Sequence, residues 1–218
     1  MAWILAELAA GGAGVVGWRR IAARRADRAQ KAEDLDVART MADEDTTLLG
    51  EQLQRLGANS PVTDMDEATR LDYQTALDAY ESAKRAVPRL RSADEVSSVV
   101  DTLTAGRYAL ARVQARLAGE PLPTRRTPCF FNPLHGPATT DVRWTAPGHG
   151  TRTVPACAQD AARVKNGEQP EIRMVRIGQT AWPYWDAGHA YLPYGRTWFN
   201  TGVLETTYRA QAGGLYGR

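Results

Sequence analysis

The feature that most constrains the fold is an abrupt change of composition at residues 119–126, GEPLPTRR. Before this point, apolar residues over residues 30–118 recur at the three- and four-residue spacing of amphipathic helices. After it, proline, glycine, threonine and tryptophan dominate, and prolines and glycines interrupt helices. We therefore expect an α+β protein, with an antiparallel helical region over residues 32–119 and a small β-rich module over residues 126–200.

The helical region begins with a helix over about residues 32–56. Gly57 offers a left-handed C-cap at its end, and Pro61 opposes continuation. Within this helix, residues 43–45 form a short acidic cluster, Asp-Glu-Asp. Three consecutive residues point in different directions around a helix, so we interpret the cluster as part of a solvated polar face and not as a cation site.

Two further helices start at capping signals. Asp64, followed three residues later by Glu67, predicts the start of the second helix, and Pro88 ends it. Ser92 opens the third helix by the same device, and Gly119 closes it. Short connections between three helices indicate antiparallel packing, as a bundle or a long hairpin.

The N-terminal residues 2–18, AWILAELAAGGAGVVGW, form an apolar run near the shortest length that crosses a bilayer, about 17 residues. Trp3 and Trp18 stand at its two ends, where indole rings favour the lipid–water interface. A basic segment follows directly and contains Arg19, Arg20, Arg24, Arg25, Arg28 and Lys31. We predict a transmembrane anchor at residues 1–18 and a basic juxtamembrane segment at residues 19–31.

The order of charges predicts the topology of this anchor. A secretory signal peptide carries positive charge before its apolar core, whereas here the arginines follow the core. The positive-inside rule then places the residues after Arg19 in the cytoplasm, with the basic segment against anionic membrane lipid. A soluble or interfacial helix and a cleaved signal peptide stay as alternatives. The glycines and alanines of the run form a small-residue face, which is compatible with a homo-oligomer.

The C-terminal half reads as short strands around one short helix. The expected strands are residues 127–131, 141–145, 151–154 and 171–176; the expected hairpin turn is residues 147–150 and the expected helix residues 157–164. The strand, hairpin and helix order resembles a treble-clef or ribbon-type zinc finger. This resemblance covers about thirty residues.

The resemblance implies a ligand set of Cys129, His135, Cys157 and Asp160. Two departures from the finger pattern stand out: five residues separate the first pair where two are usual, and an aspartate replaces the last cysteine. We therefore prefer a degenerate finger that keeps the fold without a cofactor. Zinc is the alternative, because it accepts thiolate, imidazole and carboxylate ligands. A disulfide between the two cysteines is a further alternative, which a cytoplasmic location opposes.

The same residues allow a thiol-dependent enzyme as a second class of function. Cys157 lies where a helix N-terminus lowers the pKa of a thiol, and His135 or His149 could act as base. No family signature surrounds the cysteine and nothing supplies an oxyanion hole, so we rank this reading below a non-enzymatic protein.

The last part of the module is the most aromatic stretch of the chain. Its Gly and Pro residues exclude a long helix, so the aromatic side chains either cover the core or form a surface for a partner protein. The candidate partner-binding residues are Trp182, Tyr184, Trp185, Tyr191, Tyr194 and Trp198. Few arginines lie nearby and the formal net charge is only +2, which argues against nucleic acid as a partner. We expect a flexible tail over residues 201–218.

The complete layout is similar to that of uncharacterised membrane-anchored proteins of high-GC Gram-positive bacteria, mainly through the motifs CFFNPLHGP and VPACAQD. This resemblance implies no activity. Nucleotide-binding and zinc-protease motifs are absent from the sequence. We therefore expect a membrane-tethered cytoplasmic scaffold or adaptor without catalysis, with a metal- or thiol-dependent enzyme as the alternative.

Overall fold

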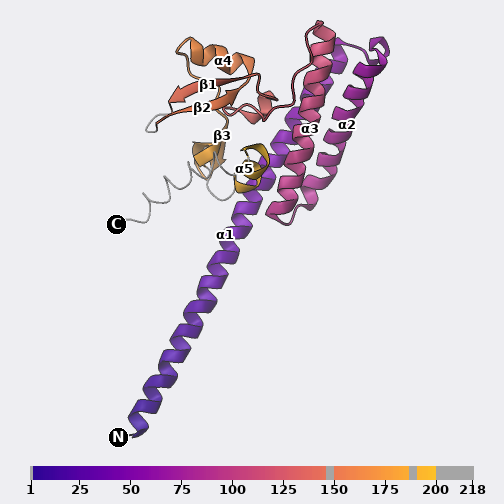
Figure 1. Ribbon diagram of the computed structural model, residues 1–218. Helices are drawn as coiled ribbons and strands as arrows, with labels where there is room; N and C mark the ends of the chain where they lie inside the picture. Colours follow the sequence, from indigo (N-terminus) through magenta and orange to yellow (C-terminus); the bar gives the residue numbers. More distant parts are fainter. Residues whose placement is uncertain (1, 146–149, 187–190, 200–218) are drawn as a thin grey trace.

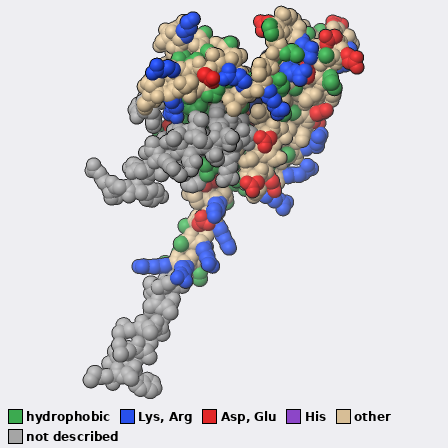
Figure 2. Space-filling model, viewed as in Figure 1, with side chains coloured by type: hydrophobic (Ala, Val, Ile, Leu, Met, Phe, Trp, Pro, Cys, Tyr) green, Lys and Arg blue, Asp and Glu red, His purple; other side chains and the backbone are tan. Residues whose placement is uncertain are grey.

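A computed structural model describes the backbone of residues 2–145, 150–186 and 191–199, and within these ranges the side chains from residue 18 to residue 195. Its longest element is α1 (Ala2–Asn59), one continuous helix of 58 residues. The C-terminal half of α1 packs into the body of the protein, and its N-terminal half projects away from that body (Figure 1). Residues 18–33 of this projecting part are exposed on every side (Figure 2).

The helical region contains the three helices that the sequence predicts. Two of them, α2 (Glu67–Ala86) and α3 (Ala93–Ala118), pack against each other and against α1. Ser92 caps α3 through a hydrogen bond from the backbone N–H of Glu95, and Gly119 ends it in the left-handed conformation with φ of +67°. Both predicted caps of this helix are confirmed. Short 3-10 turns, η1 (Val62–Asp64) and η2 (Val87–Arg89), connect the helices.

Two predicted helix boundaries are wrong. The first helix does not end at Gly57 but continues to Asn59, and the helical backbone stops only before Pro61. The second helix is capped by Asp66 and not by Asp64: the Asp66 carboxylate accepts from the backbone N–H of Thr69 at 2.6 Å. Asp64 belongs to the 3-10 turn before it, because two aspartates compete for one cap.

The membrane span expected at residues 1–18 receives no support from the fold. Within the described part of the chain, no helix combines the length and the apolar character that crossing a bilayer requires. The helical backbone also runs without a break from residues 2–18 through the basic segment and into the bundle. The expected boundaries at residues 18 and 31 therefore mark changes of sequence within one helix.

The module is built on an antiparallel hairpin, β1 (Thr140–Thr145) with β2 (Thr151–Ala156), in which Thr140 pairs with Ala156 and Thr145 with Thr151. Helix α4 (Ala158–Lys165) follows directly. These elements lie close to where the sequence places them. The expected strand at residues 127–131 is not formed, because proline has no N–H to donate to a strand ladder. A single β-bridge joins Pro128 to Pro137 instead. The turn expected at residues 147–150 lies largely outside the described residues.

A second hairpin and a final helix complete the described fold. Strand β3 (Met174–Ile177) pairs with β4 (Thr180–Pro183), and the 3-10 turn η4 (Tyr184–Asp186) follows. Sequence reasoning missed β4. Helix α5 (Leu192–Phe199) was also missed. It packs on the bundle, where the Tyr194 hydroxyl donates to the backbone carbonyl of Ala38 on α1 at 3.1 Å. The expected tail at residues 201–218 lies outside the described residues.

The core is continuous across the composition change at residues 119–126. Buried side chains of the three long helices and of the module form one apolar cluster, which includes Leu49, Leu103, Phe130 and Tyr184. Asp45, which we expected on a solvated face, is 1% exposed and pairs with Arg173 of the module. The module is therefore fixed against the bundle, which sets the position of its candidate site.

Candidate metal centre

Four side chains with metal-binding atoms meet inside the module, and they come from three local structures. Cys129 lies in the extended segment before η3 (Pro133–His135), His135 ends that turn, and Cys157 and Asp160 lie at the start of α4. The N–H of Cys129 donates to the carbonyl of Gly136 at 3.0 Å, which closes the first loop on itself. Gly136 has φ of +87°, a conformation that favours glycine.

The start of α4 places the second pair. Cys157 is the N-cap residue, and its sulfur accepts from the backbone N–H of Asp160 at 3.4 Å. Asp160 is in the first helical turn, where a carboxylate is favoured by the positive end of the helix dipole. The spacing of three residues therefore brings a thiol and a carboxylate to the same end of α4. The sequence pattern predicted this pair.

The four ligand atoms lie within 4.8 Å of one another. Oδ2 of Asp160 is 2.9 Å from Nδ1 of His135, 3.3 Å from Sγ of Cys129 and 3.5 Å from Sγ of Cys157. Sγ of Cys157 is 3.5 Å from Nδ1 of His135. In a tetrahedral zinc site with ordinary bond lengths, ligand atoms are about 3.3–3.8 Å apart. The sulfur distances match this spacing, and the imidazole–carboxylate distance is slightly shorter.

A second ring of polar groups orients the aspartate. Its other oxygen, Oδ1, accepts from the backbone N–H of Glu171 at 2.9 Å and from Nη1 of Arg163 at 3.0 Å. Oδ2 is therefore the oxygen that faces the two sulfurs and the imidazole. Hydrogen bonds of this kind to a ligand's outer atom are typical of metal sites.

The imidazole of His135 is oriented from outside in the same way. Its Nε2 lies 3.1 Å from the amide nitrogen of Asn132 and 3.4 Å from Oε1 of Glu171. With Nδ1 facing the cluster, Nε2–H can donate to the Glu171 carboxylate, which is the usual arrangement of a metal-binding histidine, whereas the Asn132 amide nitrogen is a donor and cannot accept from it. Asn132 is fixed in turn, because its Oδ1 accepts from the N–H of Leu134 at 3.1 Å.

Sequence reasoning missed these supporting residues. Asn132 carried a signal that could have been used, since asparagine before proline is typical of a capped turn. Arg163 follows Asp160 by three residues on the same helix face. Glu171 carried no local signal, because it reaches the site through a loop after α4.

Without metal, the cluster holds an unusual distribution of protons. The hydrogen bond from Cys129 and the contact with His135 lower the pKa of Cys157 to about 5, although burial opposes this. The same hydrogen bond, together with burial, raises the pKa of Cys129. Burial disfavours charge on His135, but its contacts with Cys157 and Asp160 prevail and raise its pKa to about 9. Cys157 and His135 thus form a thiolate–imidazolium pair.

Asp160 stays ionised in this environment. Burial alone would raise its pKa, but the hydrogen bonds from the Glu171 backbone and from Arg163 lower it below the usual range. The site therefore offers one carboxylate and one thiolate before any ligand arrives. A cation that replaced the protons of Cys129 and His135 would be held by three anionic groups and one neutral imidazole.

The cluster is closed to solvent. Cys129 and Asp160 are fully buried, Cys157 is 8% exposed, and the His135 side chain is 16% exposed. The three surface cavities described on the protein lie between α1 and α2, at the junction of α3 with the module, and between β1 and α4. None of these three cavities is lined by a residue of the cluster. The cluster is therefore largely buried, and the His135 side chain is its most exposed member.

An aromatic cluster packs beside this centre. Phe130, next to Cys129, stacks on Trp185 with ring centroids 5.0 Å apart, and contacts Trp144 and Tyr184 edge-on or tilted. The Tyr184 hydroxyl donates to the carbonyl of Phe130 at 2.5 Å. The described aromatic side chains after β4 are therefore part of the core, as the first of our two interpretations stated.

This burial corrects the proposed partner surface. Tyr184, Trp185, Tyr191 and Tyr194 are at most 8% exposed, so these four side chains do not form an open patch. Trp182 is 46% exposed, on β4 opposite Val175. The side chain of Trp198 lies outside the described residues.

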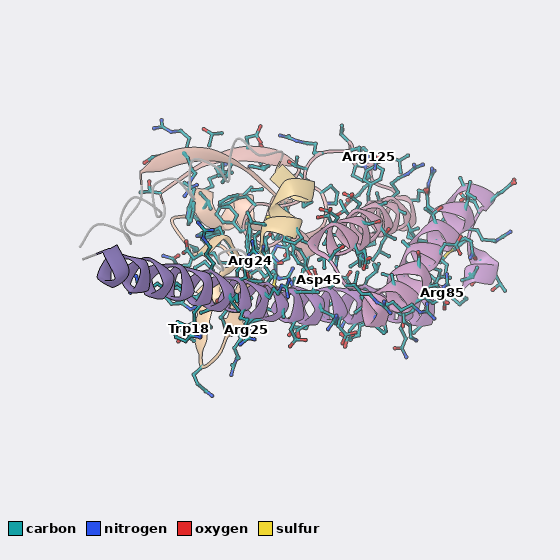
Figure 3. All side chains as sticks on the ribbon, turned by 90° about the horizontal axis from the view of Figure 1, so that it is seen from below. Trp18, Arg24, Arg25, Asp45, Arg85 and Arg125 are labelled. Atoms are coloured by element: carbon teal, nitrogen blue, oxygen red, sulfur yellow. The ribbon has the colours of Figure 1, made fainter. Side chains whose placement is uncertain are left out.

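The candidate membrane residues occupy the projecting part of α1. Trp18 is 71% exposed, and Arg19, Arg20, Arg24 and Arg25 are exposed as well. Figure 3 shows Trp18, Arg24 and Arg25 on α1, at a distance along the helix from the buried Asp45. The side chain of Trp3 lies outside the described residues.

Comparisons with protein-family models, with curated proteins and with solved structures find no match to this chain. The resemblance to membrane-anchored bacterial proteins stays a prediction. Function is therefore inferred from the geometry of the chain itself.

Proposed function

We propose that this protein is a non-enzymatic scaffold whose C-terminal module is held in shape by one structural zinc ion. The observation that carries the proposal is the convergence of two thiols, one imidazole and one carboxylate on a single buried position, within 4.8 Å of one another. Sulfur and nitrogen ligands favour zinc over magnesium or calcium, which prefer sites made only of oxygen. Four protein ligands fill a tetrahedral shell, which is the mark of a structural site.

The proposal revises one preference drawn from the sequence. In the sequence pattern, the spacing of five residues between Cys129 and His135 disfavoured zinc. In the structure, the turn at η3 brings both side chains to the same point. Phe130 and Trp144 contact each other beside the cluster, and neither belongs to the group of four ligand side chains. The zinc alternative is therefore the one that this geometry supports.

The remainder of the function follows from the arrangement of the helices. We propose that the N-terminal end of α1 tethers the scaffold to a membrane, with the bulk of the chain in the cytoplasm. The exposed basic part of α1 supports this placement. A protein partner would meet the β3–β4 hairpin, where Trp182 and Met174 are 46% and 52% exposed.

A thiol enzyme remains the second candidate because of one observation. Cys157 is an N-cap residue with a pKa lowered to about 5, and its sulfur lies 3.5 Å from His135. This pair resembles the nucleophile and base of a cysteine hydrolase. Such an enzyme needs a thiolate that a substrate can reach, and the burial of the cluster argues for zinc instead.

The test is the metal content of the purified full-length chain, measured by elemental analysis after expression with zinc. We expect about one zinc per chain, and tetrahedral absorption bands after replacement by cobalt. Cys129→Ser, Cys157→Ser and Asp160→Asn should each lose most of the metal. Asp72→Asn is the matched control, since it removes a buried aspartate of the helical bundle, outside the cluster.

Each result bears on the proposal. A folded wild-type chain without zinc, and without cobalt bands after reconstitution, would remove the structural-metal function. Loss of metal in Asp72→Asn as well would mean that the ligand variants lose zinc through unfolding. Rapid alkylation of Cys157 in the native, zinc-free chain would favour the enzyme.

A further inference from the structure

The projecting part of α1 has no packing partner among the described residues. No other long helix that the structure describes has such an unpacked part. Every residue from 18 to 33 is exposed, whereas burial on α1 begins at Ala38. A helix segment without tertiary contacts gains little stability from its own propensity. Figure 1 shows it leaving the body as a continuous extension of the bundle helix. We call residues 18–31 the basic arm.

The charge of the basic arm is almost entirely of one sign. Its cations are Arg19, Arg20, Arg24, Arg25, Arg28 and Lys31, and its only acid is Asp27. Asp27 pairs with Lys31 at 2.8 Å. Within the described part of the chain, the five arginines have no acidic partner. Figure 2 shows Lys and Arg side chains gathered around this part of the helix.

The order of residues along the axis identifies the kind of partner. The apolar sequence 2–17 comes first, then Trp18, which is 71% exposed, and then the arginines, which begin at Arg19 and flank the 52% exposed Ile21. This order matches a bilayer, which passes from hydrocarbon through an interfacial zone that favours tryptophan to the charged headgroups. An acidic protein or a nucleic acid would give no reason for the apolar sequence to precede the charges.

A second copy of the arm fits less well. A parallel pair of these helices would bring arginines of both chains together, and its seam would be mostly alanine, with Trp18 and Ile21 as the larger apolar side chains. We propose that the basic arm is a binding surface for the anionic headgroups of a phospholipid bilayer. This inference rests on the tethering part of the proposed function and is independent of the zinc site.

Distances along the helix rank the arginines. With a rise of 1.5 Å per residue, Arg25 lies about 10 Å from Trp18 along the axis, and Lys31 lies about 20 Å from it. At physiological ionic strength the charge of a surface is screened over about 8–10 Å. Arg19, Arg20, Arg24 and Arg25 therefore contribute most, and Arg28 and Lys31 contribute less.

The experiment compares binding of the full-length chain to two kinds of vesicle, one of phosphatidylcholine alone and one mixed with phosphatidylglycerol. The apolar sequence 2–17 contributes to both, so the ratio of the two partition coefficients isolates the charges. We expect a strong preference for the anionic vesicles at about 0.1 M salt that falls steeply at about 0.5 M. Glutamine at Arg19, Arg20, Arg24 and Arg25 together should lower the ratio by about a hundredfold or more.

The matched control places glutamine at four exposed arginines of the body and should leave the ratio unchanged; these are Arg55, Arg85, Arg89 and Arg91. Equal binding of the wild-type chain to both vesicles overturns the headgroup inference and leaves the tether in place. Binding to neither overturns both. An equal loss of ratio in the control variant, or a stable dimer through the arm that excludes lipid, also overturns the inference.

Discussion

Arg173, just before β3, directs both of its terminal nitrogens at the two carboxylate oxygens of Asp45 in the middle of α1. Nη1 of Arg173 is 3.0 Å from Oδ2 of Asp45, and Nη2 contacts Oδ1. The two side chains are 6% and 1% exposed. Arg107 of α3 donates to the backbone carbonyl of Asp45 at 2.8 Å. One buried ion pair thus joins residues 128 positions apart and connects the module to the bundle.

Breaking this pair from one side should be strongly destabilising. Arg173→Met leaves the Asp45 carboxylate buried without its partner, and we expect the free energy of unfolding to fall by about 3–5 kcal/mol. The double variant Asp45→Leu with Arg173→Met removes both charges and should recover most of the loss. Chemical denaturation of the wild-type chain, the two single variants and the double variant measures this. A double variant as unstable as the sum of the singles would contradict the coupling.

Gly106 of α3 lies close to both α1 and α2. A Cβ at this position would lie 2.7 Å from Cβ of Ala79 on α2 and 3.2 Å from Cδ2 of Leu49 on α1. Alanine in place of glycine normally stabilises a helix interior by about 0.5–1 kcal/mol. Here the clash should prevail, so we expect Gly106→Ala to lose about 1–2 kcal/mol of stability.

Gly50 provides the comparison for that variant. A Cβ there would meet the ring of Tyr80, which is only half-buried and can move aside. Gly50→Ala should therefore be less destabilising than Gly106→Ala in thermal melts. The reverse ranking would mean that the helix contact at Gly106 is looser than described.

Substitution of two tryptophans distinguishes an aromatic side chain of the core from one on the surface. Trp185 stacks on Phe130 and is 8% exposed, so Trp185→Ala should cost about 3–5 kcal/mol of stability. Trp182 is 46% exposed, so Trp182→Ala should cost at most about 1 kcal/mol. Equal losses in urea denaturation would return Trp182 to the core and remove it as a partner contact.

Zinc binding should release about two protons per ion at pH 6. In the metal-free chain Cys157 is already a thiolate, because its pKa is about 5, and Asp160 is ionised. The protons come from Cys129, whose pKa is raised, and from His135, whose pKa is about 9. Four ligands with ordinary pKa values would release nearly three protons at this pH, about one from each thiol and most of one from the imidazole.

The sign of the pH dependence follows from these protons. Metal binding removes them, so affinity should rise with pH, by about a hundredfold per unit near pH 6–8. Calorimetric titration of the chelator-treated chain in two buffers of different ionisation enthalpy counts the protons. Release of nearly three at pH 6 would contradict the thiolate–imidazolium pair.

Local patterns predicted the parts of the fold that local physics decides. Ser92 and Gly119 bound α3 as expected, because a side-chain cap and a left-handed glycine act within one turn. Cys157 and Asp160 were paired correctly for the same reason, since both lie in the first turn of α4. The α+β class followed from the change in composition near Gly119.

The remaining features depend on partners far away in the sequence. Asp45 was placed on the surface because nothing near it reveals Arg173. Helix α5 was missed because distant contacts hold it, such as that of Tyr194 with Ala38 of α1. Strand β4 was also missed, although its partner β3 is close in the sequence. The five-residue spacing before His135 was read as a departure, because the turn through Asn132 becomes visible only in three dimensions.

The uninterrupted backbone of α1 has a mechanical consequence. An α-helix turns by about 100° and rises by about 1.5 Å for each residue, so any lengthening of the segment before Ala38 swings the whole body around that axis. One added residue would rotate the β3–β4 hairpin about the axis of α1, so that the hairpin would face a different direction. Seven added residues would nearly restore the original direction of the hairpin and would move the body by about 10 Å along the helix axis. The length of α1 therefore sets both the rotation of the body about the helix axis and its position along that axis.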